Sequence, residues 1–275
     1  MQSGVALSDI YSGSEHVRLS FITSSVHGSG LPSVLRLDGI YFNSEQRWHE
    51  LNAPLEASYG SANAIIIQSE FDRRLITRYF GAHPNATVIH NGASADEIRT
   101  IAPYTSRQLD RFSDVWVTAS AWRPHKRLTD NIAYFMEHAA GDACLVIAGS
   151  VAVQPFVDQR VIYVGDLSQE RLWSLYRRAS HLVHLAFLDH CPNVVVDARA
   201  AGCRIVCSSS GGTREIAGPD AIVIDDLDWD MRPIALYSPP SLDFSNVGSN
   251  THLDGNIDIN YVAARYTNVL ESVVR

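Results

Sequence analysis

Lysine is almost absent from this sequence: 21 of its 22 basic residues are arginine, and the one exception is Lys126. A lysine ammonium is a compact charge on a flexible stem, whereas an arginine guanidinium is a wide planar fork. Lys126 stands where an apolar strand ends and a helical pattern begins, and such places often bind phosphate through helix-terminal N–H groups beside a cation. We therefore interpret Lys126 as a candidate phosphate ligand, with a lysine left over by chance as the alternative.

Other absences exclude several classes of protein. No apolar run approaches the roughly 18–20 residues of a membrane span, and no secretory apolar segment follows Met1. A formal net charge of −8 argues against a nucleic-acid-binding surface, which needs clustered basic residues. The four cysteines form no Cys-x-x-Cys pair, so a zinc ribbon is not expected and a reducing compartment is favoured. We expect a cytoplasmic protein with no transmembrane segment, no nucleic-acid partner and no bound metal.

The C-terminal half alternates apolar strands with helices. Short continuous apolar runs predict strands that are buried on both faces, which is typical of a parallel sheet. The alternation with helices predicts a doubly wound α/β domain. The predicted strands are 115–119, 144–149, 161–165, 182–186, 204–207 and 221–224, and the predicted helices are 128–138, 168–179 and 192–201.

The first hundred residues are less regular and show few clear helices. One helix is predicted from about residue 70 to residue 79, after a buried strand. Near the end of the chain, residues 237–255 look irregular, and residues 258–274 return to helical spacing. The strands predicted in the N-terminal half are 19–23, 34–37, 65–68 and 87–90.

Four strand ends in the C-terminal half carry charged, amide or glycine residues that could bind a ligand. In open α/β sheets, ligands bind beyond the carboxyl ends of the strands, so these residues should meet at one edge of the sheet. They are Arg123 and Lys126 after the first strand, Gly149 at the end of the second, Asp189, Asn193 and Asp197 after the fourth, and Gly211, Gly212 and Glu215 after the fifth.

The basic residues and the glycines fit a phosphate site. Lys126 and Arg123 would neutralise a diphosphate. Gly211 and Gly212 would let backbone N–H groups approach a ligand at the start of a helix, because glycine has no Cβ. The sequence therefore predicts an anion site at this edge.

The acidic residues fit hydroxyl recognition. Asn193 and Asp197 are four residues apart, on one face of a helix, and Asp197 could accept hydrogen bonds from the two hydroxyls of a ribose. Asp189 lies in the loop before that helix. We do not expect Asp189 and Asp197 to act as a glycosidase pair, because nothing else supports general-acid chemistry. The acidic segment 225–230 is interpreted as a solvated turn rather than a metal motif.

A family resemblance follows from these motifs. Asp189, seven intervening residues and Asp197, followed by Gly-Gly-Thr-Arg-Glu at 211–215, resemble the Glu-x7-Glu and Gly-Gly-x-x-Glu pattern of retaining glycosyltransferases of family 4, also called glycosyltransferase group 1. Residues 122–126 resemble that family's diphosphate-binding segment, and residues 62–71 and 88–92 resemble the end of its N-terminal domain. The match keeps order and spacing over roughly residues 60–225.

The resemblance implies an architecture. It implies the α/β GT-B fold, in which two Rossmann-like domains with parallel sheets face a central cleft, here with a reduced N-terminal domain. The implied divisions are an acceptor-side domain at 1–110, a donor-binding domain at 111–255, and a C-terminal helix at 256–275 that crosses back to the first domain.

The resemblance also implies an activity. A sugar would pass from a UDP- or GDP-sugar to an unidentified acceptor hydroxyl, with retained anomeric configuration and no required cofactor. Lys126 would hold the donor diphosphate with help from Arg123, and Asp189 would contact the donor sugar. We expect Asp197 to bind the ribose, and the remaining donor-side residues to be Asn193, Gly149, Gly211, Gly212 and Glu215.

The chain also departs from the family pattern. Both acids are aspartate where glutamate is usual, Ala121 stands at the position of a family arginine, and Asp38 stands where many members carry a histidine. The opening units of the N-terminal domain are missing. Two alternatives therefore stay open: a nucleotide-sugar-binding subunit that needs a partner chain or a second copy for catalysis, and a nucleotide-sugar epimerase.

Overall fold

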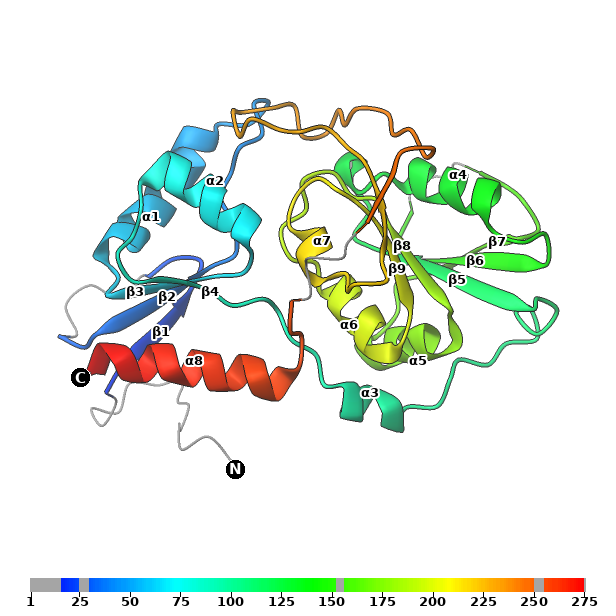
Figure 1. The fold of residues 1–275 in the computed structure, drawn as a ribbon, viewed down its shortest axis with the longest axis horizontal. Helices are drawn as coiled ribbons and strands as arrows, with labels where there is room; N and C mark the ends of the chain where they lie inside the picture. The colour runs from blue at the N-terminus through cyan, green and yellow to red at the C-terminus, as the bar shows by residue number, and fades with distance from the viewer. Residues whose placement is uncertain (1–15, 25–29, 152–155, 250–254, 275) are drawn as a thin grey trace.

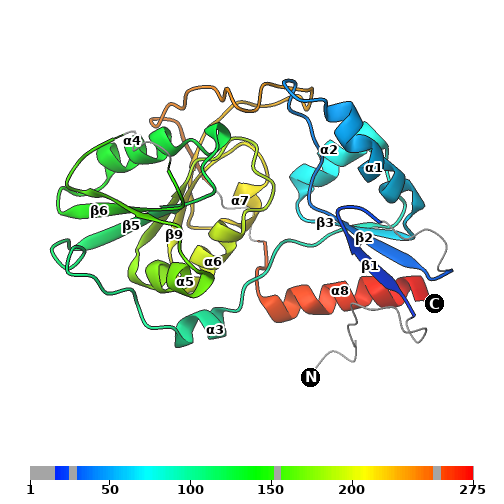
Figure 2. The ribbon, with the colours of Figure 1, turned by 180° about the vertical axis from the view of Figure 1, so that it is seen from behind.

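The computed structural model describes residues 16–24, 30–151, 156–249 and 255–274. They form two α/β domains that lie side by side, each built on a largely parallel sheet (Figure 1). The last helix of the chain returns to the N-terminal domain, as the view from behind also shows (Figure 2).

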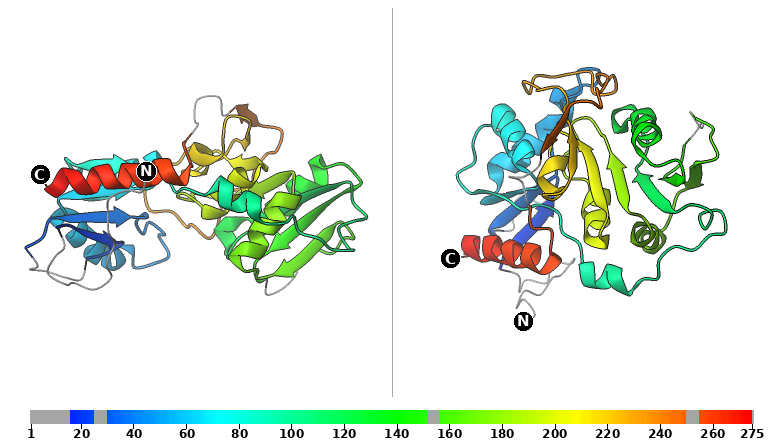
Figure 3. Two further views of the ribbon diagram at one scale, coloured as in Figure 1. Left: turned by 90° about the horizontal axis from the view of Figure 1, so that it is seen from below. Right: turned by 45° about the vertical axis from the view of Figure 1, so that its right-hand side comes forward.

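The N-terminal domain contains a four-stranded parallel sheet in the order β1-β2-β3-β4. Helices α1 and α2 cover one face of this sheet, and α8 covers the other (Figure 3). The sequence did not predict α1. The elements are β1 (Arg18–Phe21), β2 (Ser33–Leu37), α1 (Trp48–Ser61), β3 (Ala64–Ile67), α2 (Glu70–Phe80), β4 (Ala86–Val88) and α8 (Ile259–Val274).

The side chains of β3 show how two cores form around one strand. Ile65 and Ile67 point toward α1 and α2 and pack in a cluster with Leu75. Ile66 points to the opposite face and packs in a cluster with Leu270 of α8. Successive strand residues alternate between the two faces, so a strand covered on both sides must be apolar throughout.

The C-terminal domain contains a seven-stranded sheet in the order β11-β10-β9-β8-β5-β6-β7. All neighbouring strands are parallel except β11, which pairs antiparallel with β10 and was not predicted. The strands are β5 (Asp114–Ala119), β6 (Ala143–Ala148), β7 (Val161–Gly165), β8 (His181–His184), β9 (Arg204–Ser208), β10 (Ile222–Ile224) and β11 (Val247–Ser249).

This strand order has a topological switch point between β5 and β8. From β5 the chain moves outward to β6 and β7, and it then returns to start β8 on the other side of β5. Ligands of doubly wound sheets bind at the carboxyl ends of the strands where the order reverses. The helices are α3 (Ala95–Thr100), α4 (Leu128–His138), α5 (Gln169–Arg178), α6 (Asn193–Ala201) and α7 (Thr213–Ile216), with a short 3-10 helix, η1 (Pro124–Lys126).

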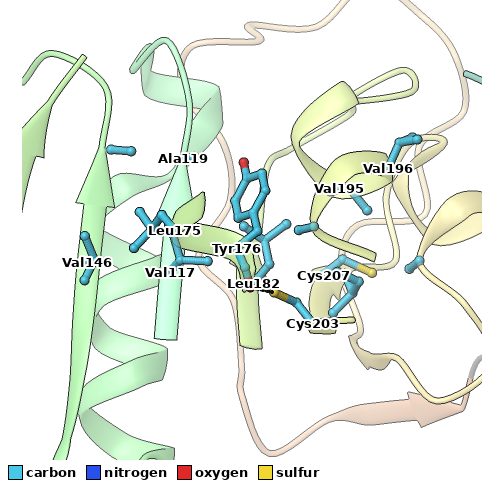
Figure 4. Packing of buried hydrophobic residues seen from close by; sticks show 14 of the residues in the cluster. Val117, Ala119, Val146, Leu175, Tyr176, Leu182, Val195, Val196, Cys203 and Cys207 are labelled. Atoms are coloured by element: carbon cyan, nitrogen blue, oxygen red, sulfur yellow. Dashed lines mark hydrogen bonds between the residues drawn. The ribbon is translucent and has the colours of Figure 1, made fainter. Parts of the chain in front are cut away.

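Tyr176 of α5 lies in the centre of one core of this domain (Figure 4). It packs with Val117 of β5, Leu182 of β8 and Val195 of α6, and all four side chains are fully buried. This core holds α6 against the two strands that flank the switch point. The start of α6 is thereby positioned beside the predicted ligand edge.

Three stretches of chain join the domains. The first follows β4 and the second precedes α8. These two crossing segments run side by side, because the Ala93 N–H donates to the Ile257 carbonyl at 2.8 Å. The third stretch, residues 226–240, is called the strap here. The strap pairs with the N-terminal domain near Asn43, and its Trp229 packs on Phe42 with ring centroids 4.7 Å apart. The sequence predicted no such crossing.

Candidate functional site

Lys126 is placed by a sharp change of chain direction after β5. It ends η1, and the next residue, Arg127, adopts a left-handed backbone with φ 50° before α4 begins. The Lys126 ammonium lies 2.5 Å from Oδ2 of Asp189, which follows β8. Two of the predicted site residues thus meet at the switch point, one from each flanking strand.

Asp189 receives three donors. The Lys126 ammonium and Nε2 of His184 share Oδ2, with the histidine at 2.8 Å, and the His190 backbone N–H donates to Oδ1 at 3.0 Å. Burial alone would raise the pKa of Asp189, but Lys126 and His184 outweigh it and hold that pKa well below its usual range. Burial lowers the pKa of His184, so its imidazole is a neutral donor. Asp189 is therefore a carboxylate at neutral pH.

The glycine pair packs backbone against backbone. The Gly212 N–H donates to the Asp189 carbonyl at 2.7 Å. A Cβ on Gly212 would overlap the His190 carbonyl oxygen, and one on Gly211, whose φ is 80°, would overlap the Asp189 carbonyl. Gly211 and Gly212 therefore fix the loop that carries Asp189. Their contact with a ligand stays a prediction. The Gly212 N–H already donates to the Asp189 carbonyl.

The side chains of Asn193 and Asp197 extend from α6 to different partners. Asn193 accepts a 2.8 Å hydrogen bond from Asn91 of the N-terminal domain, and Asn91 also accepts one from Arg36. Asp197 accepts a 2.9 Å hydrogen bond from the Trp173 indole. Burial raises the pKa of Asp197, and the indole hydrogen bond opposes that shift. The ribose role of Asp197 stays a prediction.

Arg123 and Gly149 lie apart from these contacts. Arg123 is exposed, and its side chain makes no hydrogen bond or ion pair with any described residue, although its backbone carbonyl accepts a 2.8 Å hydrogen bond from the Lys126 N–H. Gly149 has a φ of 103°, and a Cβ there would overlap the Ser120 carbonyl. Its N–H donates to the Gly165 carbonyl at 2.8 Å. Gly149 therefore allows the ends of β5, β6 and β7 to approach closely. Contacts of Arg123 and Gly149 with a sugar donor stay predictions.

Glu215 crosses the domain boundary. Its carboxylate accepts hydrogen bonds from the backbone N–H groups of Glu70 and Phe71 at 2.7 and 2.8 Å. These groups open α2, so Glu215 of one domain caps a helix of the other, where a negative charge is favourable. His90 Nε2 lies 3.0 Å from the same carboxylate. The sequence predicted Glu215 only as a donor-cleft residue.

Arg127 carries an ion pair that the sequence did not predict. Its guanidinium is buried, contacts the Asp226 carboxylate at 2.7 and 3.1 Å, and donates to the Pro240 carbonyl at 2.8 Å. The interpretation of 225–230 as a solvated turn is therefore wrong for Asp226, whose side chain is 1% exposed. The pair ties the strap to the loop that holds Lys126. The arginine directly after Lys126 was the sequence feature that could have indicated a buried partner for one of these acidic residues.

The described residues offer neither a metal-binding cluster nor a membrane-spanning helix. Across the described ranges, no group of three or more His, Cys, Asp or Glu residues is placed to hold a metal ion. His181 stacks on Trp116 with ring centroids 4.1 Å apart, away from the Asp189 cluster. No helix in the described part of the chain combines the length and apolar character needed to cross a membrane.

Comparisons with known proteins identify a family that resembles the domain carrying this site. Residues 117–231 match the family described as glycosyl transferases group 1. A search of curated protein sequences finds no significant match. The sucrose-phosphate synthase of Thermosynechococcus elongatus has a TM-score of 0.60 and 14% identity, with 88% of this chain and 68% of that chain covered.

Two further solved structures are similar. Anabaena HepE in complex with UDP has a TM-score of 0.63 and 14% identity, with 88% of this chain and 72% of that chain covered. A UDP-forming alpha,alpha-trehalose-phosphate synthase from Burkholderia xenovorans has a TM-score of 0.60 and 13% identity, with 89% and 69% covered. The predicted GT-B fold and the resemblance to group 1 are confirmed. Family 4 membership and retained configuration stay predictions.

Proposed function

We propose that this protein, which carries a glycosyl transferases group 1 domain on a GT-B fold, transfers a sugar from a nucleoside diphosphate donor to an acceptor hydroxyl with retained configuration. The observation that carries the proposal is the contact between Lys126 and Asp189 at the switch point between β5 and β8. That point is where a doubly wound sheet binds a nucleotide.

The charges at the contact suit this reaction. A departing nucleoside diphosphate needs electrostatic stabilisation, which a preorganised cation supplies. Asp189 neutralises the Lys126 ammonium. A bound diphosphate would take over Lys126, and Asp189 would then accept hydrogen bonds from the donor sugar while His184 still held it in place.

The choice of donor is guided by the similar structures. HepE has been solved with UDP and with UDP-glucose, and the Burkholderia enzyme is UDP-forming. We therefore propose a UDP-sugar as the first donor to test, with GDP-sugars next. The N-terminal domain would form the acceptor side of the cleft.

The test is release of nucleoside diphosphate from labelled UDP- and GDP-sugars, with simple sugar acceptors and without them. We expect release by the wild type, a product anomer that matches the donor by NMR, and loss of release in Lys126→Ala. Lys126→Arg retains the charge but not the compact shape and serves as the matched variant. Near-normal turnover in Lys126→Ala would overturn the role of Lys126. Nucleotide binding without turnover would favour the partner-dependent subunit.

A further inference from the structure

His190 and Asp72 form a pair that the proposed mechanism has not used. Nδ1 of His190, in the C-terminal domain, contacts Oδ1 of Asp72, in the first turn of α2 of the N-terminal domain. Asp72 is fully buried, and its other oxygen accepts a 2.9 Å hydrogen bond from the Ser69 hydroxyl. The carboxylate is therefore fixed, and it fixes the imidazole from across the domain boundary.

The other nitrogen of His190 is open. The His190 side chain is 27% exposed, whereas Asp72 is 0% exposed. Nε2 has no hydrogen-bond partner among the described residues, and it is not among their buried unpaired atoms, so it reaches solvent. The ring packs closely on Gly39, where a Cβ would lie 2.6 Å from Cε1. One nitrogen is thus held by a buried carboxylate, and the second is open to solvent in the residue that directly follows Asp189.

The donor site has too few cations for the negative charge of a diphosphate, and Nε2 of His190 could supply another. The only lysine of the chain, Lys126, is already paired with Asp189, and the exposed Arg123 side chain has no hydrogen bond or ion pair with a described residue that would orient it toward the site. A nucleoside diphosphate is negative on both phosphates, and one ammonium shared with a carboxylate does not neutralise it. A diphosphate site would therefore need a second cation in the loops around Asp189. His190 directly follows Asp189 and can carry a positive charge.

We propose that His190, held by Asp72 of the opposite domain, is a second cationic ligand for the donor diphosphate and donates its Nε2–H to a phosphate oxygen. The inference rests on the proposed function, since it names a residue of the same donor site. It also makes that site complete only when the two domains are in contact, because the carboxylate that supports the imidazolium belongs to the N-terminal domain.

The groups around the ring support the protonated form. Burial would lower the pKa of His190, but the Asp72 carboxylate outweighs it and raises that pKa, with a smaller contribution from Asp189. Lys126 acts in the opposite direction. His125 is also close enough to interact with His190, and burial holds the pKa of His125 at about 4, so it is neutral above that pH. The imidazolium is thus favoured by two carboxylates and opposed by one ammonium.

The experiment is calorimetric titration of UDP, GDP and ADP into the full chain between pH 6 and pH 8.5. The variants are His190→Gln, Asp72→Asn and, as a matched surface control, His49→Gln. Comparison between variants removes the nucleotide's own titration. A charge-assisted hydrogen bond is worth about 1.5–3 kcal/mol, which is roughly 10–100-fold in affinity. We expect His190→Gln to lose about tenfold at pH 6 and little at pH 8.5.

The pH dependence of nucleotide binding separates the possible outcomes. Wild type and His49→Gln should bind more tightly as the pH falls, His190→Gln should lose that extra slope, and Asp72→Asn should move it to lower pH. Nucleotide binding with the same slope in His190→Gln would overturn the inference and leave the proposed function intact. No binding of any nucleotide to the wild type would overturn the proposed function itself. If a variant folds poorly, NMR of the wild type decides: bound nucleotide should raise the pKa of His190, and an unchanged titration would refute the contact.

Discussion

Asp189 is the residue on which the charges of the site converge. One carboxylate oxygen receives an ammonium from the β5 loop and an imidazole from β8, and the other receives a backbone N–H from its own loop. Removing one partner of such a buried group leaves an uncompensated charge, which typically costs about 3–5 kcal/mol. The aspartate is therefore both a structural anchor and the expected sugar ligand.

At the residue scale, sequence reasoning worked where the fold imposes proximity. Lys126 and Asp189 follow β5 and β8, which are neighbours in the sheet, so the loops after these strands lie together. Glu215 and Asp226 were placed incompletely because their partners, the start of α2 and the buried Arg127, lie far away in sequence. Nothing in a local pattern encodes a contact between residues that are so far apart in the sequence.

His125 provides a pH test of the same loop. Burial and the neighbouring Lys126 lower the pKa of His125 to about 4, while the unfolded chain has the usual value near 6.5. Between these values the unfolded state binds more protons, so the free energy of unfolding should rise with pH from 4 to 6.5, by up to about 3 kcal/mol.

The measurement is denaturant unfolding at several pH values for the wild type and His125→Gln. The difference between the two proteins isolates His125 from His184, whose pKa shift has the same direction. We expect the wild type to lose more stability than the variant as the pH falls from 6.5 to 4. Parallel curves would show that His125 is not held neutral in the folded state.

At the scale of elements, the glycine loop before α7 positions the Asp189 loop by direct backbone contact. Gly212→Ala should destabilise the protein by about 1–3 kcal/mol, because the added methyl collides with the His190 carbonyl. Gly60→Ala is the matched control. Gly60 lies in α1 with nothing within 4 Å of an added Cβ, so alanine should stabilise by about 0.5–1 kcal/mol.

Thermal unfolding of these two variants checks the contrast. Gly212→Ala should lower the Tm, and Gly60→Ala should leave it unchanged or raise it. A neutral Gly212→Ala would mean that the two loops are farther apart than the 2.7 Å hydrogen bond between Gly212 and Asp189 requires.

The elements also show where sequence patterns fail. Helices α4, α5 and α6 were predicted to within a residue or two, because apolar spacing and residues such as Ser168 and Gly202 mark their ends. Helix α1 was missed because Pro54 and Gly60 lie inside it, and both disfavour helix. It forms because Leu55 and Tyr59 are buried against the sheet, which is a tertiary effect.

At the scale of the whole molecule, the loops that follow β9 and β10 also hold the domains together. Glu215 caps α2 across the boundary, and the strap packs Trp229 on Phe42 and Phe71. Glu215→Ala should remove the cap, loosen the interface and increase the radius of gyration in small-angle X-ray scattering. Glu215→Gln retains an acceptor oxygen without the charge and should give a smaller increase. An unchanged scattering profile for Glu215→Ala would show that the strap and the paired crossing segments suffice.

Calorimetric binding of nucleoside diphosphates to the wild type and to Lys126→Ala, with circular dichroism to verify folding, is the direct test of a nucleotide site at the switch point. The contact between Lys126 and Asp189 predicts that one nucleotide class binds the wild type and that the variant loses roughly 10–100-fold in affinity, since a hydrogen bond to a charged group is removed. Equal affinity in a folded Lys126→Ala protein, or no binding of any nucleotide to the wild type, would contradict the assignment of the switch point as a donor site.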